Sequence, residues 1–309
     1  MQQIRNIKSI QVFEAVARVK NVTNVARLLN TSQSSVSYHI KKLEADLRVA
    51  LFKRTPTGLE LTEDGAVLAR HVERGLATIQ TGLEKVVRKT DSVKVALLSM
   101  FATRWLSSRL GDLRDTHPGL QLTVQNHNNT YAKLDQPESF ADLGIQWGRG
   151  DWKNFDVRRL WSEKLVVVCS PQFRVEHPIA TPSDLENCTL LHVDDERMWA
   201  EWFSNNGLAL SSSQPQMMLE DRHFQLSSTM NGLGVSLFTS WLVESELQSG
   251  TLINPFARHF DTSFAYHLMV PKDSQLSQAA IDFKGWLLGC CDQHEDNLAK
   301  QTPPKIDVT

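Results

Sequence analysis

The sequence of 309 residues lacks the features of a membrane-spanning, disulfide-bonded or metal-holding protein. No apolar run approaches the roughly 18 to 20 residues that a membrane-spanning helix requires. The first segment has no apolar signal-peptide core. Its four cysteines, Cys169, Cys188, Cys290 and Cys291, form no CxxC pair. We therefore expect a cytoplasmic protein with no disulfide framework, no metal site and no membrane partner.

Motifs of common enzyme classes are missing as well. The sequence has no phosphate-binding GxxxxGK[ST] and no GxSxG nucleophile turn, and GLG at residues 232–234 lacks the third glycine of a dinucleotide-binding loop. The one cluster of His294, Glu295 and Asp296 belongs to a polar segment that we expect to be disordered. We therefore expect neither an enzyme nor a cofactor.

The small net charge of −2 hides an asymmetry along the chain. Residues 1–90 carry 15 Lys and Arg against 8 Asp and Glu, a net of +7, whereas residues 91–309 carry 18 against 27, a net of −9. A basic module joined to an acidic one indicates that the first part binds a polyanion such as DNA. A domain that is basic by chance is the alternative, and the motifs decide between the two.

Three short amphipathic helix patterns follow one another in the basic module. The first has apolar residues at Ile10, Phe13, Val16 and Ala17. Thr23 is predicted to cap the second helix, and Ser32 the third. The predicted buried side of the third helix consists of Val36, Ile40, Leu43 and Leu47. Two short helices joined by a tight turn form a helix-turn-helix.

The other face of the third helix has the chemistry of a DNA-reading surface. Gln pairs with adenine edges, while Ser, Tyr and Lys contact bases or phosphates. The predicted contacts are Ser32, Gln33, Ser34, Ser37, Tyr38, Lys41 and Lys42. A solvated helix face is the alternative, but the position of this helix in a three-helix basic module favours the reading surface.

The segment LFKRTPTGLELT, residues 51–62, predicts a short β-hairpin, or wing, beside the reading helix. Its basic residues Lys53 and Arg54 are predicted to contact the DNA backbone or the minor groove. An ordinary exposed basic pair is the alternative.

Thr62 is predicted to cap a long helix with a nearly heptad apolar stripe. The stripe consists of Leu68, Val72, Leu76, Ile79, Leu83 and Val86. A repeat close to 3.5 residues favours the pairing of two such helices. We therefore predict dimerisation through this stripe, and packing against the protein's own domain is the alternative.

From Ser92 onward strand patterns alternate with helical ones, which predicts an α/β fold with mainly parallel pairing. Two apolar strands, VVVCS and FAYHLMV, bracket a second set of elements and are predicted to join two lobes around a cleft. Ligands of such sheets bind beyond the carboxyl ends of strands. The predicted effector contacts are Ser99, Met100, Phe101, Thr103, Asn126, His127, Asn128, Gly148, Arg149, Asp221, His223 and Tyr266.

This set contains one cation, free helix amides and several uncharged hydrogen-bonding groups, which suit a small ligand with a carboxylate or another anion. For each residue, a surface loop or a structural hydrogen bond is the alternative. The two histidines in particular could be structural.

The residues from Phe13 to Gly65, with AVARVKNVTNVARLLNTSQSSVSYHIKKLE and LTEDG, resemble the DNA-binding end of the LysR-type transcriptional regulators. DLGIQWGRGDW, LVVVCSP, NGLGVSLF and SELQSGTLINPF extend the resemblance over nearly the whole chain, within the branch of the glycine-cleavage and β-lactamase regulators. Arg48 stands where the family usually has Gly, and Tyr38 where it often has Arg or His. Met100 and His223 replace hydroxyl residues of the β-lactamase regulator, so the resemblance does not by itself imply muropeptide binding.

The resemblance implies a periplasmic-binding-protein-like sensor and a tetramer on DNA, with ligand contacts at Ser99, Met100, His223 and Tyr266. We expect a winged helix-turn-helix and a linker helix, then a two-lobed effector domain and a disordered tail. Their predicted limits are 1–61, 62–90, 91–295 and 296–309, with one lobe at 91–166 plus 268–292 and the other at 167–267.

The predicted function is therefore sequence-specific transcription regulation under the control of a small anionic, amino-acid-like or other carboxylate effector. The expected partners are double-stranded DNA, the effector, further copies of the chain and RNA polymerase. A solute-binding protein of the same two-lobed fold is the alternative, but such a protein should carry a secretory signal and no basic module.

Overall fold

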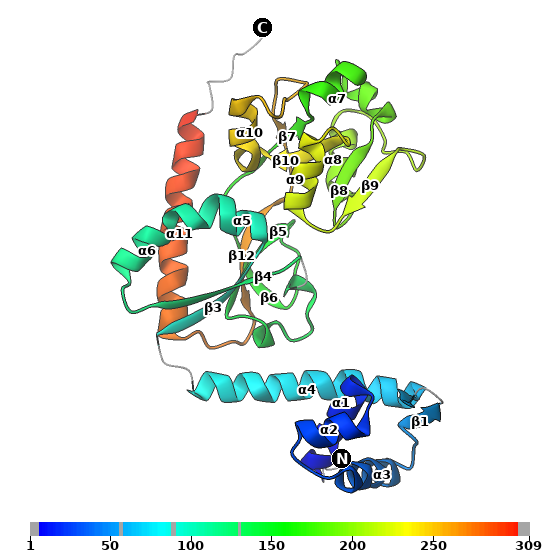
Figure 1. The fold of residues 1–309 in the computed structure, drawn as a ribbon. Helices are drawn as coiled ribbons and strands as arrows, with labels where there is room; N and C mark the ends of the chain where they lie inside the picture. Colours follow the sequence, from blue (N-terminus) through cyan, green and yellow to red (C-terminus); the bar gives the residue numbers. More distant parts are fainter. Residues whose placement is uncertain (1–5, 56–57, 88–90, 129–130, 302–309) are drawn as a thin grey trace. The chain divides into compact units, whose positions relative to one another are not determined.

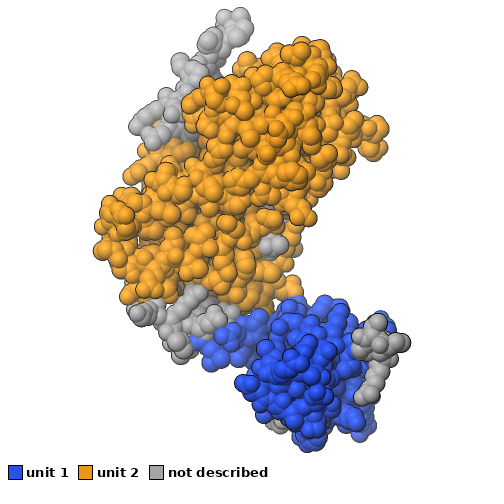
Figure 2. Space-filling view, in the orientation of Figure 1, with its two compact units in different colours: residues 1–88 blue, residues 89–309 orange. Residues whose placement is uncertain are grey.

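The computed structural model describes residues 6–55, 58–87, 91–128 and 131–301. The chain forms two compact units, residues 1–88 and residues 89–309 (Figure 2). Within the described residues, every helix is too short or too polar to cross a membrane.

The first unit consists of three helices, a β-hairpin and one long helix (Figure 1). Its elements are α1 (Ile7–Val19), α2 (Val22–Leu28), α3 (Gln33–Leu47), β1 (Phe52–Thr55), β2 (Gly58–Leu61) and α4 (Glu63–Val87).

Polar side chains begin these helices as local sequence predicts, with one exception. The Ser32 hydroxyl accepts a hydrogen bond from the Ser35 N–H in the first turn of α3, and the Thr62 hydroxyl accepts one from the Gly65 N–H in the first turn of α4. The prediction that Thr23 caps the second helix is wrong, because α2 already begins at Val22. Its cap is Asn21, whose side-chain oxygen accepts the Asn24 N–H at 3.0 Å.

The core of the first unit lies between α1, α3 and α4. Phe13, Val36 and Ile40 are buried in it, as the helix patterns predict. Leu47, predicted to be buried, is instead 38% exposed in the last turn of α3. Arg48 ends α3 in the left-handed conformation with φ of 57°, which costs a residue other than glycine about 1 kcal/mol.

The second unit contains two five-stranded sheets, each flanked by helices (Figure 1). The first sheet has the order β4-β3-β5-β12-β6 and the second the order β11-β7-β10-β8-β9. The strands are β3 (Ser92–Leu97), β4 (Gln121–Asn126), β5 (Leu143–Gly148), β6 (Phe155–Arg159), β7 (Lys164–Val168), β8 (Leu190–Val193), β9 (Gln216–Leu219), β10 (Val235–Thr239), β11 (Phe260–Asp261) and β12 (Ala265–Pro271).

Eleven helical segments lie between residues 99 and 243 in the described part of the second unit. They are α5 (Ser99–Phe101), η1 (Ala102–Leu106), η2 (Ser107–Arg109), α6 (Leu110–Thr116), η3 (Tyr131–Lys133), η4 (Pro137–Ser139), α7 (Pro171–Glu176), η5 (Pro182–Asn187), α8 (Arg197–Asn205), α9 (Arg222–Met230) and η6 (Ser240–Val243). Two more, α10 (Glu244–Ser249) and α11 (Gln278–Gln301), follow later in the chain.

The expectation of mainly parallel pairing is wrong. Among the described strands, four neighbouring pairs of the two sheets are parallel and four are antiparallel. All four antiparallel pairs involve β7 or β12, the strands that follow the two crossings between the lobes. Each of these strands therefore enters its sheet against the direction of its neighbours.

Several lobe and tail boundaries predicted from the sequence differ from those in the structure. The second sheet begins at Lys164 and the first resumes at Ala265, so each lobe boundary lies about three residues before its predicted place. An isolated antiparallel bridge joins Ile253 to Cys169. Residues 296–301 are helical within α11, so this part of the expected disordered tail is wrong, and residues 302–309 lie outside the described residues.

One buried apolar cluster links the two lobes. Phe101 follows β3 and Trp161 precedes β7, and both pack with Phe238 of β10 in this cluster. A second cluster fills the other side of the second sheet around Trp199 and Phe203 of α8. The shared core holds the ends of both sheets next to each other.

Candidate functional site

The face of α3 that is predicted to read DNA is exposed, while its opposite face is buried. All seven predicted DNA contacts, from Ser32 to Lys42, lie on the exposed side. The Lys42 ammonium lies 5.9 Å from the centre of the Tyr38 ring, and the Tyr38 side chain is 59% exposed. The exposed face of α3 is thus polar and cationic, and its opposite face packs into the apolar core of the first unit.

The wing is tied to the reading helix by one carboxylate. Glu44 of α3 accepts hydrogen bonds from the backbone N–H groups of Leu51 at 2.8 Å and Phe52 at 3.2 Å. Lys53 forms an exposed ion pair with Glu60 across the hairpin at 3.3 Å. The side chain of Arg54 lies outside the described residues. These bonds fix the start of the wing relative to α3.

The apolar stripe of α4 divides into two parts. Leu68, Val72 and Leu76 pack against the core of the first unit, as the alternative to dimerisation proposes. Ile79 and Leu83 are 55% and 58% exposed. The side chain of Val86 lies outside the described residues. The stripe available to a second copy is therefore shorter than predicted.

In the second unit, a hollow of about 410 Å³ between the two sheets brings together half of the predicted effector contacts. We call it the inter-lobe pocket. The predicted residues in its wall are Ser99, Met100, His127, Asn128, Asp221 and Tyr266. The Ser99 hydroxyl donates to the Asp221 carboxylate at 3.2 Å, which connects α5 in one lobe to the start of α9 in the other.

The other six predicted contacts do not line this pocket in the described structure. Phe101 is fully buried in the shared core, and Asn126 is exposed at the end of β4. Thr103 and His223 lie 3.4 Å apart, Oγ1 to Nε2, and connect η1 to α9 outside the lining. Gly148 has a different role: a Cβ there would come within 2.6 Å of the Trp152 ring, so glycine lets Trp152 lie against β5.

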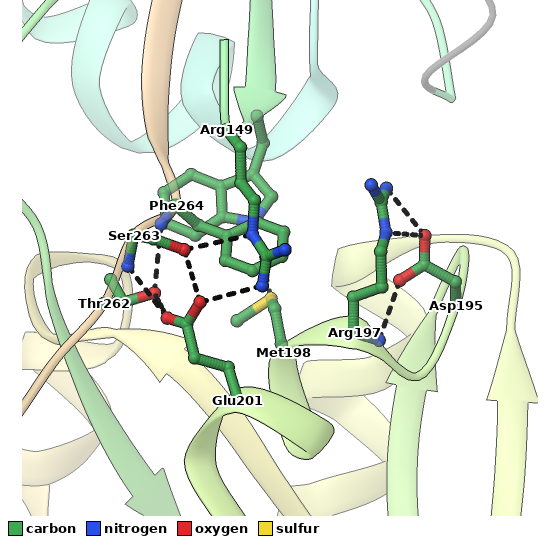
Figure 3. A network of polar contacts seen from close by, with 9 residues as sticks. Arg149, Asp195, Arg197, Met198, Glu201, Thr262, Ser263 and Phe264 are labelled. Atoms are coloured by element: carbon green, nitrogen blue, oxygen red, sulfur yellow. Dashed lines mark hydrogen bonds and ion pairs between the residues drawn. The ribbon is translucent and has the colours of Figure 1, made fainter. Parts of the chain in front are cut away.

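Arg149, the predicted cation of the site, is already paired (Figure 3). Its guanidinium lies 3.0 Å from Glu201 of α8 and donates to the Ser263 hydroxyl at 3.0 Å. Glu201 also accepts from the Thr262 hydroxyl at 2.7 Å, and these bonds hold the pKa of Glu201 below its usual range although burial opposes them. The ring of Phe264 packs 4.8 Å from the Arg149 guanidinium. This cluster joins the lobes and leaves Arg149 without a free charge.

Arg222 is a cation in the wall of the inter-lobe pocket. The first residue of α9, it donates to Gln225 and to the Leu237 carbonyl at 3.1 Å each, and to the sulfur of Met198 at 3.1 Å. These acceptors are all uncharged. Burial lowers the pKa of Arg222, and Asp194 opposes this through space. A ligand carboxylate beside this half-buried guanidinium would form charge-assisted hydrogen bonds with it.

The inter-lobe pocket also has wall residues that were not predicted, among them Asp194, Arg222 and Trp147. Asp194 directly follows β8, and the rule that ligands bind beyond strand ends, applied to this strand, would have selected it. Arg222 lies between two predicted residues at a helix start, where a cation was not anticipated. Trp147 is the last large residue of β5 and lines the pocket.

Burial determines the protonation of two further residues in the wall. Desolvation lowers the pKa of His127 to about 4, so its imidazole is neutral near pH 7. Its ring packs beside Tyr131, with centroids 5.9 Å apart. Desolvation also raises the pKa of Tyr266, so its hydroxyl stays protonated. Both residues can offer hydrogen bonds to a ligand but no charge.

Comparisons with known proteins match both units. Residues 7–66 match the model for bacterial regulatory helix-turn-helix proteins of the lysR family, and residues 88–291 match the LysR substrate binding domain. The glycine cleavage system transcriptional activator of Escherichia coli (strain K12) is 31% identical over 286 residues, 91% of this chain and 92% of that protein. The transcriptional activator AmpR of Pseudomonas aeruginosa is 30% identical over 285 residues, 91% of this chain and 94% of that protein.

Solved structures agree with this match. The effector domain of AmpR from Pseudomonas aeruginosa has a TM-score of 0.61 at 27% identity and covers 68% of this chain and 99% of its own. The full-length virulence activator AphB of Vibrio cholerae has a TM-score of 0.57 at 17% identity, covers 92% of this chain and 98% of its own, and shows the shared fold. These relatives are transcription regulators and not enzymes.

Proposed function

The chain belongs to the LysR family of bacterial transcription regulators, and we propose that it recognises a specific operator and changes its DNA affinity when a small carboxylate-bearing molecule occupies the inter-lobe pocket. DNA binding and an effector domain come with the family. The solute-binding alternative is not favoured, because the chain carries the helix-turn-helix unit.

The exposed polar face of α3 carries the DNA part of this proposal. Sequence preference resides in Gln33, Ser34, Ser37 and Tyr38, whose side chains reach base edges in a major groove. Affinity for any sequence resides in Lys41, Lys42, Lys53 and Arg54, whose charges release counterions from the phosphates. Two copies joined through Ile79 and Leu83 would place two reading helices on one operator. A tetramer, a contact with RNA polymerase and a cytoplasmic location are further parts of this proposal, and membership of the family supports them.

Arg222 carries the effector part. Its partly buried guanidinium lines the pocket and hydrogen-bonds only to the uncharged groups named above within the described structure. A ligand carboxylate would form charge-assisted hydrogen bonds with it. The ligand can shift the equilibrium between two DNA-binding forms only by its difference in affinity for them.

Fluorescence anisotropy tests the DNA part. Purified protein is titrated onto duplexes that tile the DNA upstream of its gene, with scrambled duplexes of equal length, at two salt concentrations. Gln33→Ala should reduce discrimination between the operator and the scrambled duplex. Lys42→Ala should weaken binding to the operator and to the scrambled duplex alike. It should also reduce the slope of log affinity against log salt concentration by about one.

The matched control is Lys272→Ala, an exposed lysine of the second unit, which should change neither quantity. An equal loss of discrimination from Gln33→Ala and Lys42→Ala would contradict the division of roles. Equal, salt-sensitive binding to all duplexes would contradict sequence-specific recognition.

A further inference from the structure

The last helix, α11, packs near its end against the crossing between the two lobes. Earlier in the helix it lies beside β3 of the first lobe (Figure 1), with Leu287 buried in the shared core. Further on, the ring centroid of His294 lies 4.6 Å from that of Trp161, 6.0 Å from Trp105 and 6.1 Å from Trp241. We call His294 and these three indoles the aromatic cage.

The three indoles of the aromatic cage come from different parts of the second unit. Trp105 belongs to η1 of the first lobe, Trp241 to η6 of the second, and Trp161 lies at the crossing between β6 and β7. Trp161 also packs on the other two, with centroids 5.3 Å from Trp105 and 5.9 Å from Trp241. One side chain of α11 therefore contacts both lobes and the crossing, so a change in the angle between the lobes would disturb its packing.

The aromatic cage holds His294 by edge-to-face packing. The plane of the imidazole is inclined by 68° to that of Trp161, by 83° to that of Trp105 and by 82° to that of Trp241. The buried Nε2 of His294 makes no hydrogen bond with any residue that the structure describes. These contacts suit a neutral imidazole better than an imidazolium, because both N–H groups of an imidazolium need acceptors.

A neighbouring cation also opposes a charge on His294. The guanidinium carbon of Arg109 lies 4.1 Å from the centre of the Trp105 ring, and Arg109 donates to the Trp105 carbonyl at 2.6 Å. Burial, and then the charge of Arg109, lower the pKa of His294 from its ordinary value of 6.5 to about 4. The caged imidazole is therefore neutral near pH 7.

Other charged or titratable groups lie on the elements that form the aromatic cage. They are Arg104 of η1, Glu163 at the crossing, and Cys290, Cys291, Asp292 and Glu295 of α11. Arg104 forms an ion pair with Glu246 of α10 at 2.6 Å. Asp292 lies 3.7 Å from Arg158 of β6. Burial raises the pKa of Glu163 to about 8, so this carboxyl is uncharged where an imidazole titrates. These groups leave the repulsion by Arg109 in place.

We propose that His294 is a proton-sensitive latch between the two lobes. The neutral imidazole stays in the aromatic cage and holds the lobes at their present angle. An imidazolium leaves the cage for water, which frees the end of α11 and lets the lobes move relative to each other. The latch adds a response to pH that requires neither DNA nor an effector.

The release of His294 depends on pH because the released side chain takes up a proton more readily than the caged one. The pKa of His294 is about 4 in the cage and 6.5, its ordinary value, in water. Below pH 6.5 the released form gains a proton, so the ratio of released to caged molecules rises about tenfold for each pH unit until the caged form is protonated as well. Between pH 7.5 and 5.5 this ratio should rise about tenfold.

Hydrogen exchange of the full chain at pH 7.5 and 5.5, followed by mass spectrometry, tests the latch. His294→Phe keeps an uncharged ring in the cage, and His294→Lys introduces a charge. Protection is compared between proteins at equal pH, which cancels the pH dependence of intrinsic exchange and the titration of Glu163. Relative to His294→Phe, the unaltered protein should lose protection about tenfold between pH 7.5 and 5.5, both at the end of α11 and in η6. His294→Lys should show low protection there at both pH values.

The matched control is His259→Phe, which changes an exposed histidine of the second lobe and should respond to pH as the unaltered protein does. If His294→Phe fails to fold, His294→Leu, also uncharged, takes its place. An unchanged ratio between the two pH values overturns the latch. A loss confined to α11 while η6 stays protected overturns the link between the lobes. An equal loss of protection in β8 overturns it too, because the lobe itself would then be unfolding.

Discussion

Glu163 is a carboxyl group buried at a crossing between the lobes. Glu163 lies between β6 and β7 and is only 3% exposed. The indole N–H of Trp241 donates to its two carboxyl oxygens at 3.1 and 3.3 Å. Burial raises the pKa of Glu163 from its ordinary value of 4.5 to about 8, although the Trp241 hydrogen bond opposes this. The folded protein therefore keeps a proton that the unfolded chain releases.

The sign of the pH dependence follows from this difference. Between pH 4.5 and 8 the unfolded chain binds fewer protons than the folded protein, so the free energy of unfolding falls as the pH rises through this window. One pKa unit corresponds to about 1.4 kcal/mol. Between pH 5.5 and 7.5 the contribution of Glu163 should fall by about 2 kcal/mol on an order-of-magnitude basis.

Glu163→Gln removes the titration while keeping the size of the side chain. The eight tryptophans all lie between Trp105 and Trp286, so tryptophan fluorescence during urea unfolding reports on the second unit alone. The free energy of unfolding of the unaltered protein should fall between these two pH values. In the variant this fall should be smaller by about 2 kcal/mol. Glu186→Gln, which changes an exposed carboxyl, should keep the full decline.

The difference between the two curves is the decisive quantity, because other groups titrate in the same range. Identical pH dependence in the unaltered protein and in Glu163→Gln would refute a protonated Glu163. A decline that is lost in Glu186→Gln as well would show that it does not arise from the buried carboxyl.

Two predictions concern the long helix α4. Gly65→Ala should destabilise the first unit by about 1–3 kcal/mol or more, because its Cβ would lie 2.1 Å from the Leu51 carbonyl oxygen, whereas Gly75→Ala, with open space around it, should stabilise by up to about 1 kcal/mol. Far-UV circular dichroism in urea measures both, and equal effects would contradict the close approach. Leu83→Lys should weaken dimerisation about tenfold or more, because it removes an apolar contact, while Val67→Lys off the stripe should not; sedimentation equilibrium measures this, and unchanged association of Leu83→Lys would contradict pairing through α4.

The first unit was largely predictable because its determinants are local. Helix periodicity, the cap at Ser32 and the cap at Thr62 all depend on residues within a few positions of one another. The error at Thr23 is of the same kind, since Asn21 two residues earlier is an equally good cap. The division of the α4 stripe was not predictable, because apolar residues at the same spacing serve both an internal core and an interface.

In the second unit the sequence pattern identified two lobes and half of the pocket wall, but of the charged wall residues only Asp221. Strand ends led to Ser99, His127 and Asp221, which the fold brings together. The pairing direction of β7 and β12 depends on where the chain crosses between the lobes. A period of two residues carries no information on that crossing.

The sequence by itself therefore determined the family, the reading helix and the two-lobed plan, because these depend on local periodicity and on motifs. Only the tertiary structure decided which arginine is held by a carboxylate and which is held by uncharged acceptors. Arg149 is neutralised by Glu201, a residue about fifty positions away on the other lobe, while the hydrogen bonds of Arg222 go to uncharged partners. Whether a charge is available to a ligand depends on its neighbours in space, and those neighbours are set by the packing of the lobes.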